Sequence, residues 1–432
     1  MSTLLLYLGI FAVFFVIGVP IVLSLSLSAI ILLYFSDVQV LVFAHQFIKS
    51  MDNYSLTAIF FFILAGEIMN SGGMTKRIIA AVSKKLGNIP GGLAMVAGVS
   101  AMIFAAINGS AIATAAAIGA IMIPAMQKQK YGSAYSGAVV AAGGVVGPII
   151  PPSIPVILYG SITGAAIPSL FVGGMILGLL ITAGHVVLSY IIGKKRGYYV
   201  PKSAVKNMGN VIDVEENESK GVIWAIMLPI FIMVTIVAGI FTATEAAAFT
   251  VVYAFIISKF VYKELKLEGI TQIFERSMKS TGTVMAIVGS ASAVAWVLTY
   301  NRVPQQVADY LLKFADSQMV FMLIVFILLV IVGMIMDLTP AILILAPIFI
   351  APVTQYGIDP VYFGVIFLAI LTTGLITPPV GTLIFTACGM TKKTFSEVSK
   401  ELIPYTIVTF AVILIAVFVP QIITFLPNLL YQ

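Results

Sequence analysis

The sequence predicts an all-α polytopic membrane protein, and its composition and apolar runs carry this prediction. Hydrophobic residues make up 60% of the 432 positions and charged residues only 9%, whereas a soluble chain has about 25% charged residues. The mean hydropathy is +1.12. The apolar runs reach the roughly 20 residues that a helix needs to cross a bilayer, and the chain is long enough for about ten crossings. A transmembrane β-barrel would instead show alternating strands of about ten residues.

Motifs for several kinds of chemistry are missing from the sequence. The single cysteine, Cys388, cannot form an internal disulfide, and neither His45 nor His185 has a second zinc ligand near it in the sequence. We find no metalloprotease motif, no phosphate-binding loop and no nucleophile with a histidine partner. We therefore expect no enzyme activity, no nucleotide hydrolysis and no organic cofactor.

The net charge of +6 is gathered in clusters, which indicates membrane topology rather than nucleic-acid binding. By the positive-inside rule, segments rich in Lys and Arg face the cytoplasm. These segments are residues 76–85, 128–130, 194–206, 259–279 and 392–400. The rule predicts crossings at 3–19, 21–42 and 55–70, amphipathic surface segments at 74–86 and 259–279, and a cytoplasmic linker at 194–221. The N-terminus lacks the basic residues of a cleaved signal peptide.

Residues 90–127 are predicted to form a re-entrant helical hairpin. The stretch contains no charged residue, yet basic residues flank both of its ends, so both ends are expected on the same side of the membrane. Asn108, Gly109 and Ser110 lie midway along it. Irregular backbone at that depth is tolerated only where protein or a wet cavity covers it. These three residues are therefore the expected tip of the hairpin.

Residues 134–160 are predicted to form a broken transmembrane helix. Gly147, Pro148, Pro151 and Pro152 occur within six positions. Proline has no backbone N–H and its ring clashes with the preceding turn, so a continuous helix cannot pass through this stretch.

The second half of the chain repeats this pattern. Asp337 and Thr339 lie at a certain distance along the sequence from the first tip. The Gly374 to Pro379 stretch lies at nearly the same distance from the first break. The charge bias predicts a second hairpin at about 320–353, entered from the opposite side, and a second broken helix at about 361–388. We predict two inverted-topology repeats, residues 1–193 and 222–432, joined by the linker at 194–221. Such repeats point to a transporter whose site lies between the broken elements.

The tip at 108–110, the two breaks and the Leu-Ala-Gly-Glu-Ile-Met segment at 64–69 resemble the large membrane subunit of tripartite ATP-independent periplasmic (TRAP) transporters. The resemblance covers essentially the whole chain and is greatest to the sialic-acid members. It implies an elevator-type, sodium-coupled importer in the bacterial inner membrane. It also implies two partners besides membrane lipid, namely a small four-helix membrane subunit and a soluble periplasmic substrate-binding protein, and no nucleic acid.

The interrupted helices expose free carbonyls, which suit a hard cation, and free amides, which suit an anionic group. The broken elements therefore suit a hard cation and an anionic substrate. The resemblance implies that these are sodium as the coupling ion and a small organic acid, with sialic acid first and a C4-dicarboxylate next. Candidate sodium ligands are Asn108, Gly109, Ser110, Gly147, Pro151, Asp337, Thr339, Gly374 and Thr377. Candidate substrate-binding residues are Asn108, Ser110, Pro152, Ser153, Asp337, Thr339, Pro379 and Thr382.

Other interpretations of the same residues stay open at this point. Small residues also permit close helix packing. Asp337 is expensive to bury as a charge and alternatively caps a half-helix. Glu67 is either functional or an interfacial acid paired with a basic residue, and Arg302 either docks a partner or is solvated. A stand-alone ion-coupled carrier or a cation/proton antiporter is the main alternative. Paired inverted breaks argue against a channel, because a pore does not require them.

Overall fold

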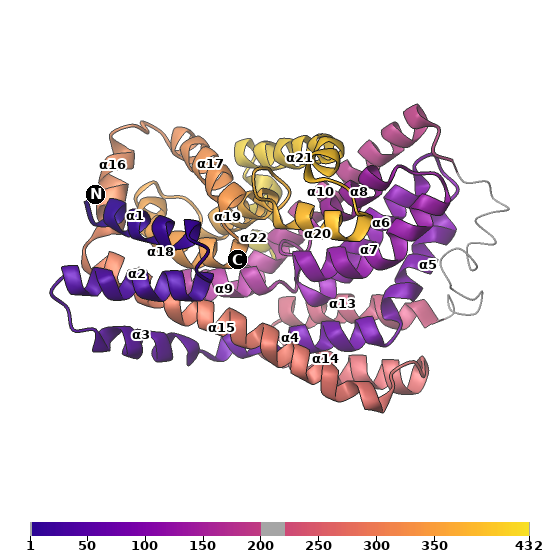
Figure 1. Cartoon of the computed structure of the whole chain (residues 1–432), viewed down its shortest axis with the longest axis horizontal. Helices are drawn as coiled ribbons and strands as arrows, with labels where there is room; N and C mark the ends of the chain where they lie inside the picture. Colours follow the sequence, from indigo (N-terminus) through magenta and orange to yellow (C-terminus); the bar gives the residue numbers. More distant parts are fainter. Residues whose placement is uncertain (1, 200–220, 432) are drawn as a thin grey trace.

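The computed structural model describes residues 2–199 and 221–431, and within these ranges every regular element is a helix. Most helices lie along the long axis of the molecule, with α1, α2 and α3 toward one end and α5 toward the other (Figure 1). Eight helices are long and apolar enough to cross a membrane. The prediction of an all-α multi-pass protein is confirmed. Most of the predicted linker, residues 200–220, lies outside the described ranges.

The N-terminal region contains one more helix than the sequence predicts. The second predicted crossing extends to residue 42, but α2 ends at Phe35 because the chain turns at Asp37, whose φ is +53°. A separate helix follows before the next crossing. Asn53 caps that crossing by accepting a hydrogen bond from the Ser55 N–H at 2.9 Å. The helices are α1 (Ser2–Val16), α2 (Ile21–Phe35), α3 (Leu41–Met51), α4 (Tyr54–Ser71) and α5 (Met74–Leu86).

The first hairpin and the first break follow α5. Helices α6 (Gly92–Asn108) and α7 (Ala111–Lys128) pack against each other and are joined at Gly109 and Ser110. Gly109 has a φ of +61°, a left-handed conformation that suits glycine. Helices α8 (Ser133–Val145) and α9 (Ile154–Thr163) are separated by the proline-rich residues 146–153. The long helix α10 (Ile167–Arg196) completes this half.

The described part of the second half, residues 221–431, is also helical. It consists of α13 (Val222–Val237), α14 (Ala243–Ile256), α15 (Ile270–Tyr300), α16 (Val303–Leu312), α17 (Gln318–Ile335), α18 (Leu338–Gln355), α19 (Pro360–Gly374), α20 (Thr382–Thr391), α21 (Phe395–Phe418) and α22 (Gln421–Tyr431). Helices α17 and α18 meet at Met336 and Asp337, and α19 and α20 are separated by residues 375–381.

Residues 259–279 do not form one separate surface segment. A π-turn at Ile257–Val261 and a short 3-10 turn at Leu267–Gly269 precede α15, which then runs without interruption for 31 residues. The change from charged to apolar residues near Ser280 does not end the helix, because no proline occurs there and the lone Gly282 is tolerated within a long helix.

The two halves pack in a similar way. Helix α7 contacts α8 and α20, and α18 contacts α19 and α9, so each hairpin touches the broken helices of both halves. Helices α6 and α17 pack on α8 and α19, and α10 packs on α21. The hairpins and breaks therefore form the centre of the larger hydrophobic core.

A second hydrophobic core surrounds α15. It joins α1, α2 and part of α4 to Ile154 and Leu158 of α9 and to Leu343, Ile344 and Ile348 of α18. Within residues 2–199 and 221–431, no hydrogen bond or ion pair joins α15 to α9 or α18. We call the contact of α15 with α18 the apolar seam.

An ion pair joins α5 to the turn that precedes α15. The buried Arg77 guanidinium pairs with the Glu264 carboxylate and donates a hydrogen bond to the Gly73 carbonyl at 3.2 Å. It also lies over the ring of Tyr262, 3.9 Å from the centroid. The Tyr262 hydroxyl in turn donates to the Gly221 carbonyl at 2.7 Å. These contacts hold together segments that are distant in the sequence.

Candidate functional site

The tip of the first hairpin is organised by Asn108. Its side-chain oxygen accepts hydrogen bonds from the Ser110 N–H at 2.8 Å and from the Thr114 hydroxyl at 3.1 Å. The Ser110 hydroxyl oxygen caps α7 by accepting from the Ala113 N–H at 3.4 Å. The amide nitrogen of Asn108 is buried without a hydrogen-bond partner. A buried N–H donor without a hydrogen-bond partner is destabilising, so this amide nitrogen is available to donate to a ligand.

The first tip lies directly against the first break. A Cβ atom built on Gly109 would be 2.7 Å from the Pro152 carbonyl oxygen, and one built on Gly147 would be 3.0 Å from the Ser110 carbonyl oxygen. Ser153 caps α9 by accepting from the Val156 N–H at 3.3 Å, and its own hydroxyl donates to the Pro148 carbonyl. Its hydroxyl is therefore already used within the break.

The tip of the second hairpin presents a carboxylate. Asp337 directly precedes α18, but its side chain makes no capping hydrogen bond to that helix. The second break lies beside it, because the Val380 N–H donates to the Met334 carbonyl at 3.3 Å and Gly374 packs against the backbone of Gly333. The side chain of Asp337 therefore does not cap α18.

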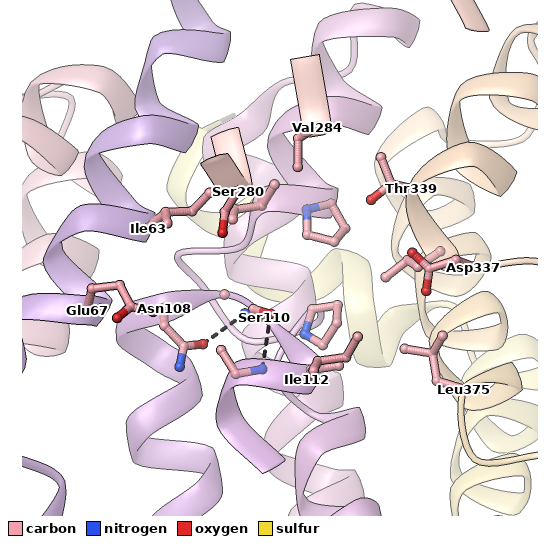
Figure 2. Close-up of a pocket in the computed structure, with 18 of the residues that line it drawn as sticks. Ile63, Glu67, Asn108, Ser110, Ile112, Ser280, Val284, Asp337, Thr339 and Leu375 are labelled. Carbon is pink, nitrogen blue, oxygen red and sulfur yellow. Dashed lines mark hydrogen bonds between the residues drawn. The ribbon is translucent and has the colours of Figure 1, made fainter. Parts of the chain in front are cut away.

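Both tips line one cavity of about 240 Å³. Figure 2 shows Asn108 and Ser110 on one side and Asp337 and Thr339 on the other. The beginning of α9 and Leu375 of the second break also contribute to the lining. Residues far apart in the sequence therefore share a single site.

Helices α4 and α15 supply a further part of the lining. Gly66, Glu67 and Asn70 come from α4, and Ser280 and Val284 come from α15. A Cβ built on Gly66 would be 2.9 Å from the Asn108 Cβ, so α4 touches the first tip. The sequence singled out Glu67 as functional or interfacial, whereas Asn70 and Ser280 were not identified. No local signal marks them, because only tertiary packing brings these helix interiors to the cavity.

The structure brings together some of the predicted site residues and leaves others apart. Those that line the cavity are Asn108, Gly109, Ser110, Asp337 and Thr339. Those that do not line it are Gly147, Pro151, Pro152, Ser153, Gly374, Thr377, Pro379 and Thr382. Of the second group, Gly147 and Pro152 contact the first tip, and the Thr377 hydroxyl donates to the Thr373 carbonyl at 2.8 Å. The Thr382 hydroxyl is buried without a partner. Their roles as ligands stay predictions.

Comparison with known proteins identifies the family. Residues 8–422 match the family of the tripartite ATP-independent periplasmic transporter, DctM component. The chain belongs to this family. It is a TRAP transporter permease, and its many apolar helices make it a multi-pass protein of the bacterial inner membrane. The resemblance seen in the sequence is confirmed at the level of the family.

Relatives of this TRAP permease are named after different substrates. The chain is 35% identical to a 2,3-diketo-L-gulonate TRAP transporter large permease of Escherichia coli over 97% of both proteins. It is 32% identical to a sialic acid TRAP transporter large permease of Vibrio cholerae over 95% of both. It is 36% identical to an isethionate TRAP transporter permease of Oleidesulfovibrio alaskensis, with 96% of this chain and 65% of that relative covered.

A solved structure shares the fold of this TRAP permease. The YdaH transporter of Alcanivorax borkumensis aligns with a TM-score of 0.66 at 12% identity, covering 87% of this chain and 86% of that one. The likeness concerns the arrangement of helices.

Proposed function

We propose that this TRAP permease imports a small organic acid by coupling its movement to sodium ions, with sialic acid favoured and a C4-dicarboxylate next. The observation that carries the proposal is the cavity shared by the two hairpin tips, where Asn108, Ser110 and Asp337 present oxygen and nitrogen groups. Hard ions such as sodium prefer oxygen ligands, and no thiol or imidazole lines the cavity.

The free energy of sodium entry is sufficient for accumulation. Each cation that enters at a membrane potential of about 100 mV releases about 2.3 kcal/mol. Two such ions release about 4.6 kcal/mol, which concentrates a neutral solute by about a thousandfold. An anionic substrate cancels part of this electrical contribution and leaves the chemical gradient of sodium.

We further propose that residues 1–193 and 222–432 are inverted repeats and that the hairpins and breaks move together as an elevator. The matching contacts of α7 with α8 and α20, and of α18 with α19 and α9, support this arrangement. A unit in which every hairpin touches both broken helices can move without taking the two tips apart.

Two partners are part of the proposal, a small four-helix membrane subunit and a soluble periplasmic substrate-binding protein. The tripartite family description supports the need for further components. The isethionate relative, of which this chain spans only 65%, has additional length in the same polypeptide. Without such partners we expect the chain to take up substrate very slowly.

A cation/proton antiporter or a proton-coupled carrier is the second candidate, and Asp337 is the observation that favours it. Its carboxylate lines the cavity and makes no capping hydrogen bond. Such a group is able to carry a proton through a transport cycle.

Uptake into proteoliposomes separates these functions. The permease is reconstituted with its two partners, and uptake of radiolabelled N-acetylneuraminate and succinate is measured with sodium, potassium or choline outside. Sodium-dependent uptake supports the proposal. Equal uptake in potassium or choline without a proton gradient contradicts it, and uptake sustained by a proton gradient alone favours the second candidate.

A further inference from the structure

The cavity has two unlike walls. The first wall consists of the hairpin tips together with the beginning of α9, and the second consists of residues from α4 and α15. Figure 2 shows Glu67 and Asp337 on opposite sides of the cavity. Each wall carries one acidic side chain, Asp337 on the first and Glu67 on the second. The walls differ in the backbone groups that they expose, and this difference bears on which acids fit.

Among the described residues of the lining, the helix N-termini all lie on the first wall. The cavity lining includes the first turns of α7, α9 and α18. Unbonded N–H groups give each helix N-terminus about half a positive charge, which favours an anion. The buried amide nitrogen of Asn108, which has no partner, lies at the same wall. One substrate carboxylate therefore finds hydrogen-bond donors there, although the same wall also carries Asp337.

The second wall offers no such donors. Glu67 lies within α4 and Ser280 within α15, so their backbone N–H groups are bonded inside the helices. Among the described residues, no Lys, Arg or His lines the cavity on either wall. A second carboxylate on the substrate would face the Glu67 carboxylate with no cationic side chain beside it.

Glu67 is held at the cavity and lacks a cationic partner. The neighbouring Gly66 packs against Asn108, which fixes this part of α4 beside the first tip. The ion pairs of the described chain join Arg77 to Glu264, Arg196 to Glu401, Lys279 to Glu275 and Lys393 to Glu397, and none includes Glu67. A free carboxylate accepts hydrogen bonds from hydroxyl groups and repels a second anion.

We propose that Glu67 restricts this permease to monoanionic acids that carry hydroxyl groups and excludes dicarboxylates. The substrate carboxylate lies at the helix N-termini beside Asn108, and its hydroxyl groups point toward Glu67, Asn70 and Ser280. This inference rests on the proposed import of an organic acid and selects sialic acid over a C4-dicarboxylate. Selection arises because the wrong ligand meets a repulsive group, not only because the right one gains contacts.

Ligand-induced thermal stabilisation of the purified complex of large and small membrane subunits tests this role without the binding protein. The probes are D-gluconate, a hydroxylated monoanion, and succinate, a dianion, each titrated in sodium buffer. We expect D-gluconate to act at concentrations about tenfold or more below those of succinate, a ratio that corresponds to about 1.4 kcal/mol. In Glu67→Gln this preference should fall below about threefold, because succinate binds better and D-gluconate worse.

Two further variants make the test specific. Glu268→Gln removes an exposed carboxylate far from the cavity lining and should keep the wild-type preference. Asn70→Lys places a cation on the second wall at an exposed position of α4 and should improve succinate binding, even if Glu67→Gln does not assemble.

The inference is wrong if wild-type protein binds succinate as well as D-gluconate, if it binds neither, or if Glu67→Gln retains the full preference. Equal stabilisation by D-gluconate in sodium and in potassium is a different result. It contradicts sodium coupling while leaving the selection by Glu67 intact.

Discussion

Gly109 packs its Cα against the carbonyl oxygen of Pro152. A Cβ atom at this position would lie 2.7 Å from that oxygen. This contact joins the tip of the first hairpin to the first break with no side chain between them. It combines with the positive φ of Gly109 to make this position intolerant of any larger residue.

Gly109→Ala is therefore expected to disturb the tip. The left-handed conformation costs an alanine about 1 to 2 kcal/mol, and overpacking adds about 1 to 3 kcal/mol. We expect a lower melting temperature and loss of most uptake in proteoliposomes. Gly282→Ala on α15 is the matched control, because a Cβ at Gly282 meets no atom within 4 Å. A Gly109→Ala protein with wild-type uptake would show that the tip does not need this contact.

Ser110→Ala tests the first tip as part of a sodium site. Loss of the hydroxyl removes a candidate oxygen ligand and the cap of α7, and the cap alone is worth about 0.5 to 2 kcal/mol. We expect the sodium concentration for half-maximal uptake to rise about tenfold, with normal assembly. Thr354→Val, an exposed position on α18, serves as the control. An unchanged sodium dependence removes Ser110 from the ion site.

Asp337→Asn distinguishes sodium coupling from proton coupling. The substitution keeps the shape of the side chain and removes its charge, so a sodium site at the second tip loses its strongest ligand. We expect sodium-driven uptake to fall at least about tenfold at every pH tested. If the wild-type protein instead requires a proton gradient and Asp337→Asn no longer responds to it, the proton-coupled alternative is favoured. Uptake by Asp337→Asn at the wild-type rate excludes both roles.

The topology prediction is tested by cysteine accessibility in a Cys388→Ala background. Lys195→Cys lies at the exposed end of α10, and Asp316→Cys lies in the exposed turn before α17. The distribution of basic residues places the first in the cytoplasm and the second in the periplasm. A membrane-impermeant maleimide added to intact spheroplasts should label only Asp316→Cys. Labelling of both positions from outside would refute the inverted arrangement.

Arg77→Ala is expected to destabilise the protein rather than to change its substrate preference. The substitution leaves Glu264 without its partner and removes the cation from the Tyr262 ring. We expect a loss of about 1 to 3 kcal/mol, measured as a lower melting temperature. Arg77→Lys keeps the charge but loses the flat guanidinium surface that stacks on the ring. Its melting temperature should therefore lie between those of wild type and Arg77→Ala. An Arg77→Ala protein as stable as wild type would show that the contact is dispensable.

The sequence predicts the irregular positions of this fold better than its helical surfaces. Gly109, Pro148 and Pro152 limit backbone conformation locally, so the tip and the break are apparent without tertiary information. Asp337 is conspicuous because a charge within an apolar run is costly. By contrast, Asn70 and Ser280 lie within helices, and their place at the cavity depends on how α4 and α15 pack. The short helices α3 and α16 escape prediction because they are amphipathic and carry too many polar residues to resemble a membrane crossing.

The apolar seam between α15 and α18 has a mechanical consequence. A hydrogen bond fixes two helices in one register, since a slip of an ångström or two breaks it. Aliphatic side chains such as Leu343 and Ile344 of α18 recover most of their dispersion energy when they move from one groove of α15 to the next. The seam therefore lets α18 shift along α15 against smaller barriers than a hydrogen-bonded contact would set.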